Sequence, residues 1–310
     1  MSKTHTGHTL QQVLTGVFAL LLNLLFPDFI ESIRYGVLAI VILVIGMPHG
    51  ALDHIITYQS FPNQSKRTKR LGFYGYYFLM MTAYGLLWLW FPLGGFLLFL
   101  LITIYHFGRA DAERFDFDES SKLLLTFTRG ITIVGLIVYG SEPAYISRIV
   151  EVLTGYNSMA LVAYIKPYFW IPLILAAVYP LAYAAVLLFT PNKTPSTLYH
   201  IDAIIVPVLF ALGDPIFAFS IYFGVWHSYN HAQTMLRYLQ KKQHEVSMKW
   251  FYQKTMLLSL ISYAGLAVLY VITEAFGDMY LLLALLFVLI SVLTLPHIFV
   301  VEMMYRKFGS

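Results

Sequence analysis

Long apolar segments recur along the whole of this 310-residue chain and constrain its fold more than any other feature. Several of them reach the roughly 20 residues that a helix needs to cross a bilayer. Continuous apolar runs of this length cross as helices, in which the backbone polar groups are paired within the segment. Charged residues make up only 12% of the chain, whereas soluble domains have about a quarter. The pattern predicts an all-α integral membrane protein, with one polytopic membrane domain over residues 1–310.

Polar loops, prolines and glycines divide the apolar sequence into about ten predicted transmembrane helices. The first is expected to be retained, because no small-residue cleavage site follows it as in a signal peptide. The spans are expected at about residues 9–29, 33–58, 71–91, 93–110, 122–140, 167–190, 199–213, 215–238, 253–275 and 279–305.

Lysine and arginine residues concentrate in alternate predicted loops. With the basic segment 66–70 placed in the cytoplasm, 16 of the 20 basic residues fall inside, three fall outside and Arg129 falls within a span. This bias predicts that both termini are cytoplasmic and that the protein is a multi-pass component of the cell (inner) membrane. Since topology accounts for the basic residues, no nucleic-acid site is predicted.

The second predicted span contains a polar stretch, Gly46-Met-Pro-His-Gly-Ala-Leu-Asp-His54. Polar side chains in hydrocarbon are costly unless they are paired or bind a metal, so this stretch predicts a functional site. Pro48 predicts a bend that directs His49 into the protein, although a bend that serves packing alone is the alternative. Asp53 follows one turn later and is expected to bond a metal ligand. His54 lies about 100° around the helix from Asp53, which gives it a supporting role.

Three further histidines join His49 as candidate metal ligands. His227 and His231 are four residues apart, which places them on one helix face. With His106, all four are expected at similar depth, where converging helices build a four-nitrogen site. Because the chain has no cysteine, such a site suits Fe, Zn, Cu or Ni, and oxygen chemistry would favour Fe²⁺. Alternatively, the histidines bond hydroxyls or carbonyls of neighbouring helices.

Residues close to these histidines have more open roles. Asp111 is interpreted as a hydrogen-bond partner of a ligand, with a solvated loop residue or a partner of Arg109 as the alternative. His297 follows a proline and could be a metal ligand. The favoured interpretation is that it donates a hydrogen bond to a ligand and packs between helices. Aromatic residues next to the histidines are candidates to line a slot for a long apolar substrate, namely Tyr105, Phe107, Trp226 and Tyr229.

The motifs at residues 46–53, 105–111, 227–231 and 295–297 resemble the signatures of the Brp/Blh family of bacterial and archaeal β-carotene 15,15′-dioxygenases. The resemblance spans nearly the whole chain. It implies a membrane enzyme that uses non-haem Fe(II) and O2 to cleave the central double bond of β-carotene into two all-trans-retinal molecules. It also implies iron ligands at His49, His106 and the pair His227 and His231, and a functional link to a microbial rhodopsin.

Two other classes of membrane protein remain as alternatives. A di-iron desaturase or hydroxylase needs about eight ligands in HxxxH and HxxHH boxes, whereas this chain has one HxxxH and no HxxHH. A proton- or metal-coupled transporter would use intramembrane histidine and aspartate, but the chain has few intramembrane acids and no visible inverted repeat. Both alternatives fit the sequence less well than carotenoid cleavage.

Overall fold

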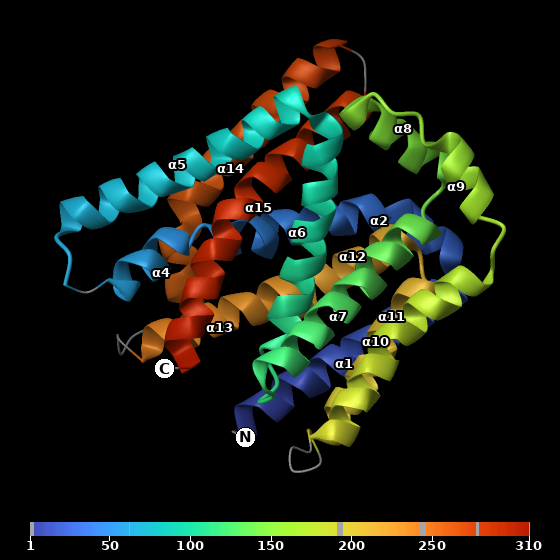
Figure 1. Ribbon diagram of the computed structural model, residues 1–310, viewed down its shortest axis with the longest axis horizontal. Coiled ribbons are helices and arrows are strands. Elements are labelled where there is room, and N and C mark those ends of the chain that lie inside the picture. Colours follow the sequence, from blue (N-terminus) through green and yellow to red (C-terminus); the bar gives the residue numbers. More distant parts are fainter. Residues whose placement is uncertain (1–2, 62, 191–194, 242–245, 277–278, 310) are drawn as a thin grey trace. The chain divides into compact units, whose positions relative to one another are not determined.

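The structure is a computed structural model that describes residues 3–61, 63–190, 195–241, 246–276 and 279–309. All regular secondary structure in these residues is helical, which confirms the predicted all-α class (Figure 1). The elements are α1 (Lys3–Leu25), α2 (Pro27–Val41), the π-helical segment η1 (Ile42–Gly46), α3 (Met47–Gly50), α4 (Asp53–Ser60), α5 (Lys66–Trp90), α6 (Pro92–Ala112), α7 (Glu119–Gly140), α8 (Pro143–Thr154), α9 (Met159–Ile165), α10 (Trp170–Phe189), α11 (Thr197–Leu212), α12 (Pro215–Ile221), the π-helical segment η2 (Tyr222–Ser228), α13 (Tyr229–Gln240), α14 (Met248–Phe276) and α15 (Met279–Gly309).

Local sequence signals explain where many of these helices begin. The helices α2, α6, α8 and α12 start at a proline, whose fixed φ suits the first helical position and whose missing N–H is not needed there. Ser65 and Asp118 cap α5 and α7 by accepting a hydrogen bond from the backbone N–H of Thr68 and Ser121, respectively.

Seven helical segments in the described residues are long and apolar enough to cross a membrane. They coincide with seven of the predicted spans and define a multi-pass membrane protein. Their bounds are His8–Leu25, Pro27–Ser60, Pro92–Ala112, Glu119–Gly140, Trp170–Phe189, Met248–Ala275 and Tyr280–Lys307.

The other three predicted spans are helical but do not belong to these seven. The segment at 199–213 corresponds to α11, which is apolar but has only 16 residues. The segment at 215–238 is divided among α12, η2 and α13, and α13 carries many polar side chains. The segment at 71–91 belongs to α5, whose first turns carry four Lys and Arg residues.

Two short helices, α8 and α9, occupy a stretch for which no helix was predicted. Neither is long enough to cross a bilayer, so a search for apolar runs of about 20 residues passes over them. In α8 the buried residues Ile149 and Leu153 are one turn apart, whereas the side chains of Arg148 and Glu151 are 48% and 40% exposed. The helix is therefore amphipathic, and its periodicity is the signal that would have revealed it.

The described residues fall into two compact units. Unit 1 comprises residues 1–42, 103–146 and 159–230, and unit 2 comprises residues 43–102, 147–158 and 231–310. Each unit therefore combines segments that are far apart in the sequence. The single polytopic domain over residues 1–310 remains a prediction.

The core of unit 1 lies among α1, α7, α10, α11 and α12. The helix α10 packs against both α7 and α11, and α1 packs along α11 (Figure 1). Fully buried side chains from three of its segments, among them Ile133, Val206, Leu209 and Tyr222, fill the space between these helices.

Two glycines in unit 1 bring the backbones of α6 and α7 into direct contact. A Cβ added to Gly130 of α7 would lie 2.0 Å from the carbonyl oxygen of Ile104, and one added to Gly108 of α6 would lie 1.7 Å from that of Thr126. No side-chain rotation relieves such a clash, so both positions require glycine. Small residues are a common means of close approach between membrane helices.

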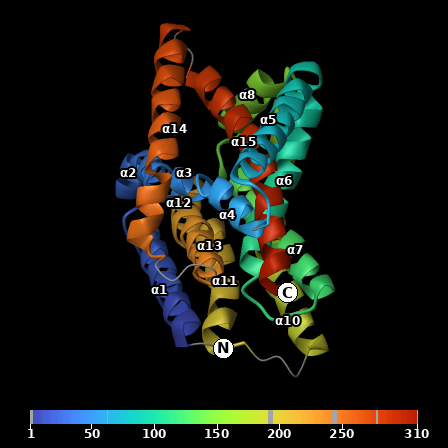
Figure 2. The same ribbon diagram turned by 90° about the vertical axis from the view of Figure 1, so that its left-hand side faces the viewer.

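Unit 2 is organised around α15, which packs against α4, α5 and α14 (Figure 2). The indole of Trp88 on α5 donates a hydrogen bond to Ser291 of α15 over 2.8 Å. The hydroxyls of Ser60 on α4 and Tyr238 on α13 are 2.8 Å apart. These contacts hold α4, α13 and α15 together, and each of the three helices carries polar residues of the candidate site.

Replacing Gly130 with alanine is expected to destabilise the protein by about 1–3 kcal/mol, because the new methyl group overlaps a backbone carbonyl. Gly75→Ala on α5 is the matched control, since a Cβ there meets nothing within 4 Å. The melting temperature in detergent should fall for Gly130→Ala and stay constant or rise slightly for Gly75→Ala. Equal melting temperatures for the two variants would contradict the close contact.

Candidate metal centre

His49 lies three residues beyond the end of an irregular helical segment. The π-helical turn η1 ends at Gly46, and the short helix α3 that follows contains Pro48 and His49. A π-helical turn contains an extra residue, and such turns are frequent at functional sites. The regular helix is thus interrupted next to Pro48, as the sequence predicts, and the His49 side chain is buried.

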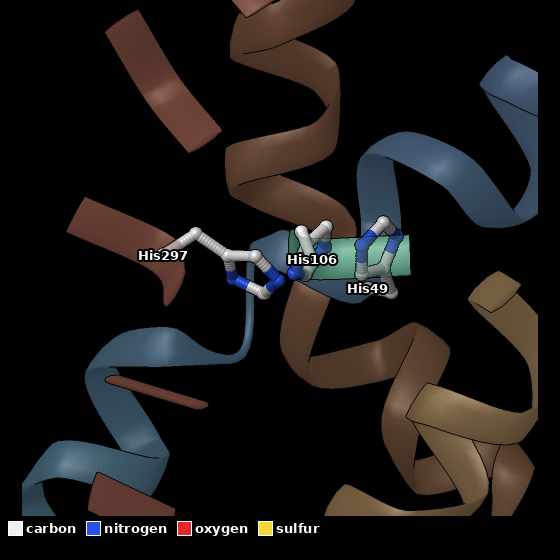
Figure 3. Close-up of side chains that lie close together, drawn as sticks. All are labelled: His49, His106 and His297. Atoms are coloured by element: carbon white, nitrogen blue, oxygen red, sulfur yellow. The ribbon is translucent and has the colours of Figure 1, made fainter. Parts of the chain in front are cut away.

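Three histidines gather within unit 2. The ring centres of His49 and His231 are 5.7 Å apart, those of His49 and His297 are 5.3 Å apart, and those of His231 and His297 are 5.4 Å apart. All three side chains are buried, and their ring planes are close to perpendicular. In Figure 3 the imidazole of His297 extends from its helix toward His49.

Ring centres this far apart are compatible with imidazoles that share one metal ion. A metal about 2.1 Å from a ring nitrogen lies about 3.2 Å from the centre of that ring. Two such ligands have ring centres about 4.6 Å apart when the angle at the metal is 90°, and about 5.6 Å apart when it is 120°. The three distances in unit 2 run from 5.3 to 5.7 Å. His49 and His297 belong to a set of buried histidines that could hold a metal, since their ligand atoms lie within 4.8 Å of one another.

Each of these rings has an outer partner at Nδ1. His49 Nδ1 lies 3.3 Å from the carbonyl oxygen of Ile45, and His231 Nδ1 lies 3.3 Å from the hydroxyl of Tyr305. His297 Nδ1 lies 2.9 Å from both carboxylate oxygens of Asp53. Metal-binding histidines commonly use one nitrogen for such a partner. A metal bound by this group would therefore be ligated through Nε2.

A second pair of histidines lies within unit 1. The ring centres of His106 on α6 and His227 in η2 are 4.6 Å apart, and both side chains are buried. This distance corresponds to a right angle at a common metal. His227 lies in the π-helical segment η2, which was not predicted from the sequence. The other π-helical segment, η1, lies just before His49.

Asp53 contacts His297 and a tyrosine. It accepts a hydrogen bond from the Tyr77 hydroxyl over 2.9 Å, in addition to its contact with His297 Nδ1. The sequence left open which histidine Asp53 serves, and the structure brings it to His297 on α15. His49 instead uses the backbone carbonyl of Ile45.

His54 lies apart from the histidine group of unit 2. Its Nδ1 is 3.0 Å from the carbonyl oxygen of Ala51, and its ring packs against Tyr58 and Phe73. It lines a cavity of about 570 Å³ together with Arg70 and Lys254, among other residues.

Asp111 belongs to a buried cluster of charges in unit 1. Arg129 Nε donates to its carboxylate over 2.7 Å, and the Tyr222 hydroxyl donates over 3.2 Å. Asp202 accepts from Arg114 over 2.9 Å and lies 3.5 Å from Arg129. The alternative of a solvated loop residue is wrong, because Asp111 is only 1% exposed. The side chain of Arg109 pairs with two other carboxylates, those of Glu113 and Glu119.

Arg114, beyond the end of α6, shows how this cluster works electrostatically. Burial would lower the pKa of its guanidinium, but the carboxylates of Asp202 and Asp111 raise this pKa above its ordinary value. The arginine therefore stays charged, and the two acids and the two arginines of the cluster offset one another.

The four aromatic candidates for substrate contacts lie in different surroundings. Phe107 is buried with its ring centre 4.8 Å from that of His227, and Trp226 is fully buried with its indole N–H bonded to Asp202. Tyr105 packs against Phe127, and Tyr229 packs against His8. A role in substrate binding remains a prediction for all four.

Several residues around these sites were not anticipated from the sequence. Tyr77 and Tyr305 were not recognised, because the chain has 23 tyrosines and nothing in the sequence sets these two apart. Asp202 and Arg114 were also missed. Asp202 could have been recognised, because its acidic side chain lies in a predicted apolar span, where a charge needs a partner.

The long apolar helices and the buried imidazoles define a multi-pass membrane protein with a histidine-rich group able to hold a metal. Residues 40–305 match the family model described as β-carotene 15,15′-dioxygenase. This match covers most of the chain and includes every candidate metal ligand. The protein therefore belongs to the β-carotene 15,15′-dioxygenase family of oxidoreductases.

Two relatives agree with this family. The β-carotene 15,15′-dioxygenase of an uncultured marine bacterium, 66A03, is 27% identical over 287 residues, which cover 90% of this chain and 96% of the relative. The probable β-carotene 15,15′-dioxygenase Blh of Halobacterium salinarum is 27% identical over 213 residues, which cover 64% of this chain and 61% of the relative. No solved structure matches the chain significantly.

The buried charge cluster is expected to be essential for stability. Asp202→Ala leaves Arg114 and Arg129 without a fully compensating charge, which costs about 3–5 kcal/mol in a buried setting. The matched control is Glu151→Ala, because Glu151 pairs with Arg148 at an exposed site and such pairs contribute less than about 1 kcal/mol. Thermal unfolding in detergent measures both effects. A melting temperature of Asp202→Ala as high as that of the control would show that the cluster does not support the fold.

Proposed function

We propose that this protein cleaves β-carotene at its central 15,15′ double bond and releases two molecules of all-trans-retinal. The observation that carries the proposal is the buried group of His49, His231 and His297, with ring spacings suited to one metal, in a chain of the carotene dioxygenase family. The enzyme would use O2 as co-substrate and Fe(II) as metal.

The proposed iron ligands are His49, His106, His227 and His231. Within unit 1 the ring centres of His106 and His227 are 4.6 Å apart, and within unit 2 those of His49 and His231 are 5.7 Å apart. His227 and His231 are also four residues apart in continuous helical structure.

Oxygen chemistry favours iron among the metals that imidazoles bind. The chain has no cysteine, which argues against a thiolate site, and neutral imidazoles suit Fe(II) when oxygen chemistry is required. Bound iron would supply the binding and activation of O2. The outer partners of the rings, Ile45, Tyr305 and Asp53, hold the imidazoles in place.

The proposed reaction needs no further catalytic group from the protein. One double bond and one O2 become two aldehydes, so no proton has to be gained or lost and no general acid or base is needed. The protein has to hold the centre of the polyene beside the metal and to exclude water from the site. The residues proposed for contact with the apolar substrate are Tyr105, Phe107, Trp226 and Tyr229.

The setting of the enzyme follows from its substrate. β-Carotene dissolves in the bilayer, and a bundle of about ten spans with both termini in the cytoplasm would let it enter between helices. The cell (inner) membrane is the proposed location. The product, retinal, is the chromophore of microbial rhodopsins, and a rhodopsin is the proposed functional partner.

Incubation of the purified protein with β-carotene under air, followed by chromatographic identification of the products, tests the proposed function. We expect retinal as the only aldehyde and about one iron per chain by elemental analysis. An apo-carotenal pair of unequal length would refute central cleavage. A protein without iron that still yields retinal would refute the metal assignment.

The variant His227→Ala/His231→Ala is expected to lose iron and to lower retinal formation by more than about 100-fold, since even outer partners of ligands contribute about 10–100-fold. His200→Gln is the matched control, because His200 is bonded to Tyr183 and lies outside the histidine groups. Iron content and retinal yield are measured for both proteins. Full retinal yield from the double variant would contradict the ligand assignment.

A further inference from the structure

The contact between Asp53 and His297 assigns the tautomer of this histidine. An ionised carboxylate has only acceptor sites, so a ring nitrogen that bonds to it has to carry the proton. His297 Nδ1 lies 2.9 Å from both oxygens of Asp53. The proton of a neutral His297 therefore resides on Nδ1, and the lone pair resides on Nε2. This is the tautomer that binds a metal through Nε2.

The carboxylate of Asp53 is itself held in place. The Tyr77 hydroxyl donates to it over 2.9 Å, and Asp53 is only 2% exposed. A buried carboxylate is costly unless its charge has partners. Tyr77 and His297 supply two donors to the carboxylate, which therefore has a fixed position from which to orient the imidazole.

A packing role does not account for this arrangement. An apolar side chain would fill the space beside His297 without the cost of burying a carboxylate. The arrangement instead matches the carboxylate–histidine–metal sequence, in which the acid orients the ring and strengthens its donor nitrogen.

The position of His297 completes the case. Its ring centre is 5.3 Å from that of His49 and 5.4 Å from that of His231, nearly equal to the 5.7 Å between those two proposed ligands. The three ring centres therefore form a nearly equilateral triangle.

We propose that His297 is a further ligand of the metal and that Asp53, held by Tyr77, is the positioning residue that orients it. This inference rests on the proposed function, because it presumes that the histidine group binds iron. It adds a fifth imidazole to the four ligands proposed above and gives Asp53 a specific role.

X-ray absorption spectroscopy of the iron-loaded wild-type protein tests the fifth ligand without any substitution. Scattering from the outer ring atoms counts the imidazoles bound to the metal. We expect five in the wild-type protein and four in His297→Ala. Added imidazole should restore the wild-type spectrum of His297→Ala by filling the space that the side chain leaves. A count of four in the wild-type protein would overturn the proposal.

Asp53→Asn and Tyr77→Phe separate orientation from ligation. We expect Asp53→Asn to keep five imidazoles but to weaken iron binding by about 10–100-fold, as the loss of outer partners does. Tyr77→Phe should produce a smaller loss of the same kind. His54→Ala is the matched control, because His54 lies on the same helix as Asp53 but contacts Tyr58 and Phe73. Unchanged iron affinity in Asp53→Asn would overturn the positioning role.

The two levels of the proposal fail in different ways. A wild-type protein that binds no iron and forms no retinal refutes the proposed function. A wild-type protein that binds iron through four imidazoles and forms retinal refutes only the role of His297.

Discussion

The cost of burying polar groups in an apolar interior governs both units of this protein. A charge placed among hydrocarbon side chains needs a partner of opposite charge, and its remaining hydrogen-bonding groups need partners as well. In unit 1 this requirement joins Asp111, Asp202, Arg114 and Arg129 into one cluster, to which α6, α7 and α11 contribute. Apolar packing alone would allow these helices to rotate about their axes. The cluster restricts such rotation because each charge has to face the others.

The same requirement shapes the candidate metal centre. Imidazoles are polar groups too, and those of His49, His231 and His297 each bond an outer partner through Nδ1. These partners are of three kinds, a backbone carbonyl, a tyrosine hydroxyl and a carboxylate, and they come from different segments of unit 2. Bonds within the protein thus constrain the directions of the three rings. A centre built in this way is organised before metal or substrate arrives, which is how preorganised sites avoid reorganisation costs.

Much of the fold was predictable because apolar length is read directly from the sequence. The all-α class and seven of the spans follow from it. The short helices α8 and α9 were not found, because amphipathic turns give a weak signal next to membrane spans. At the site, the type and spacing of the histidines pointed to candidate ligands. The pairing of Asp53 with His297 could not be predicted, because these residues are 244 positions apart in the sequence. Only the packing of α15 on α4 brings them together.

The two π-helical segments affect how residues beyond them are displayed. Each extra residue turns the rest of its helix by about 100° relative to a regular α-helix. The segment η1 ends three residues before His49, and η2 contains His227 and ends three residues before His231. The apolar face and the polar face of each helix are therefore out of phase on either side of the segment. One helix can then present hydrocarbon to the lipid along one stretch and histidine to the interior along the next, without a break in the chain's path.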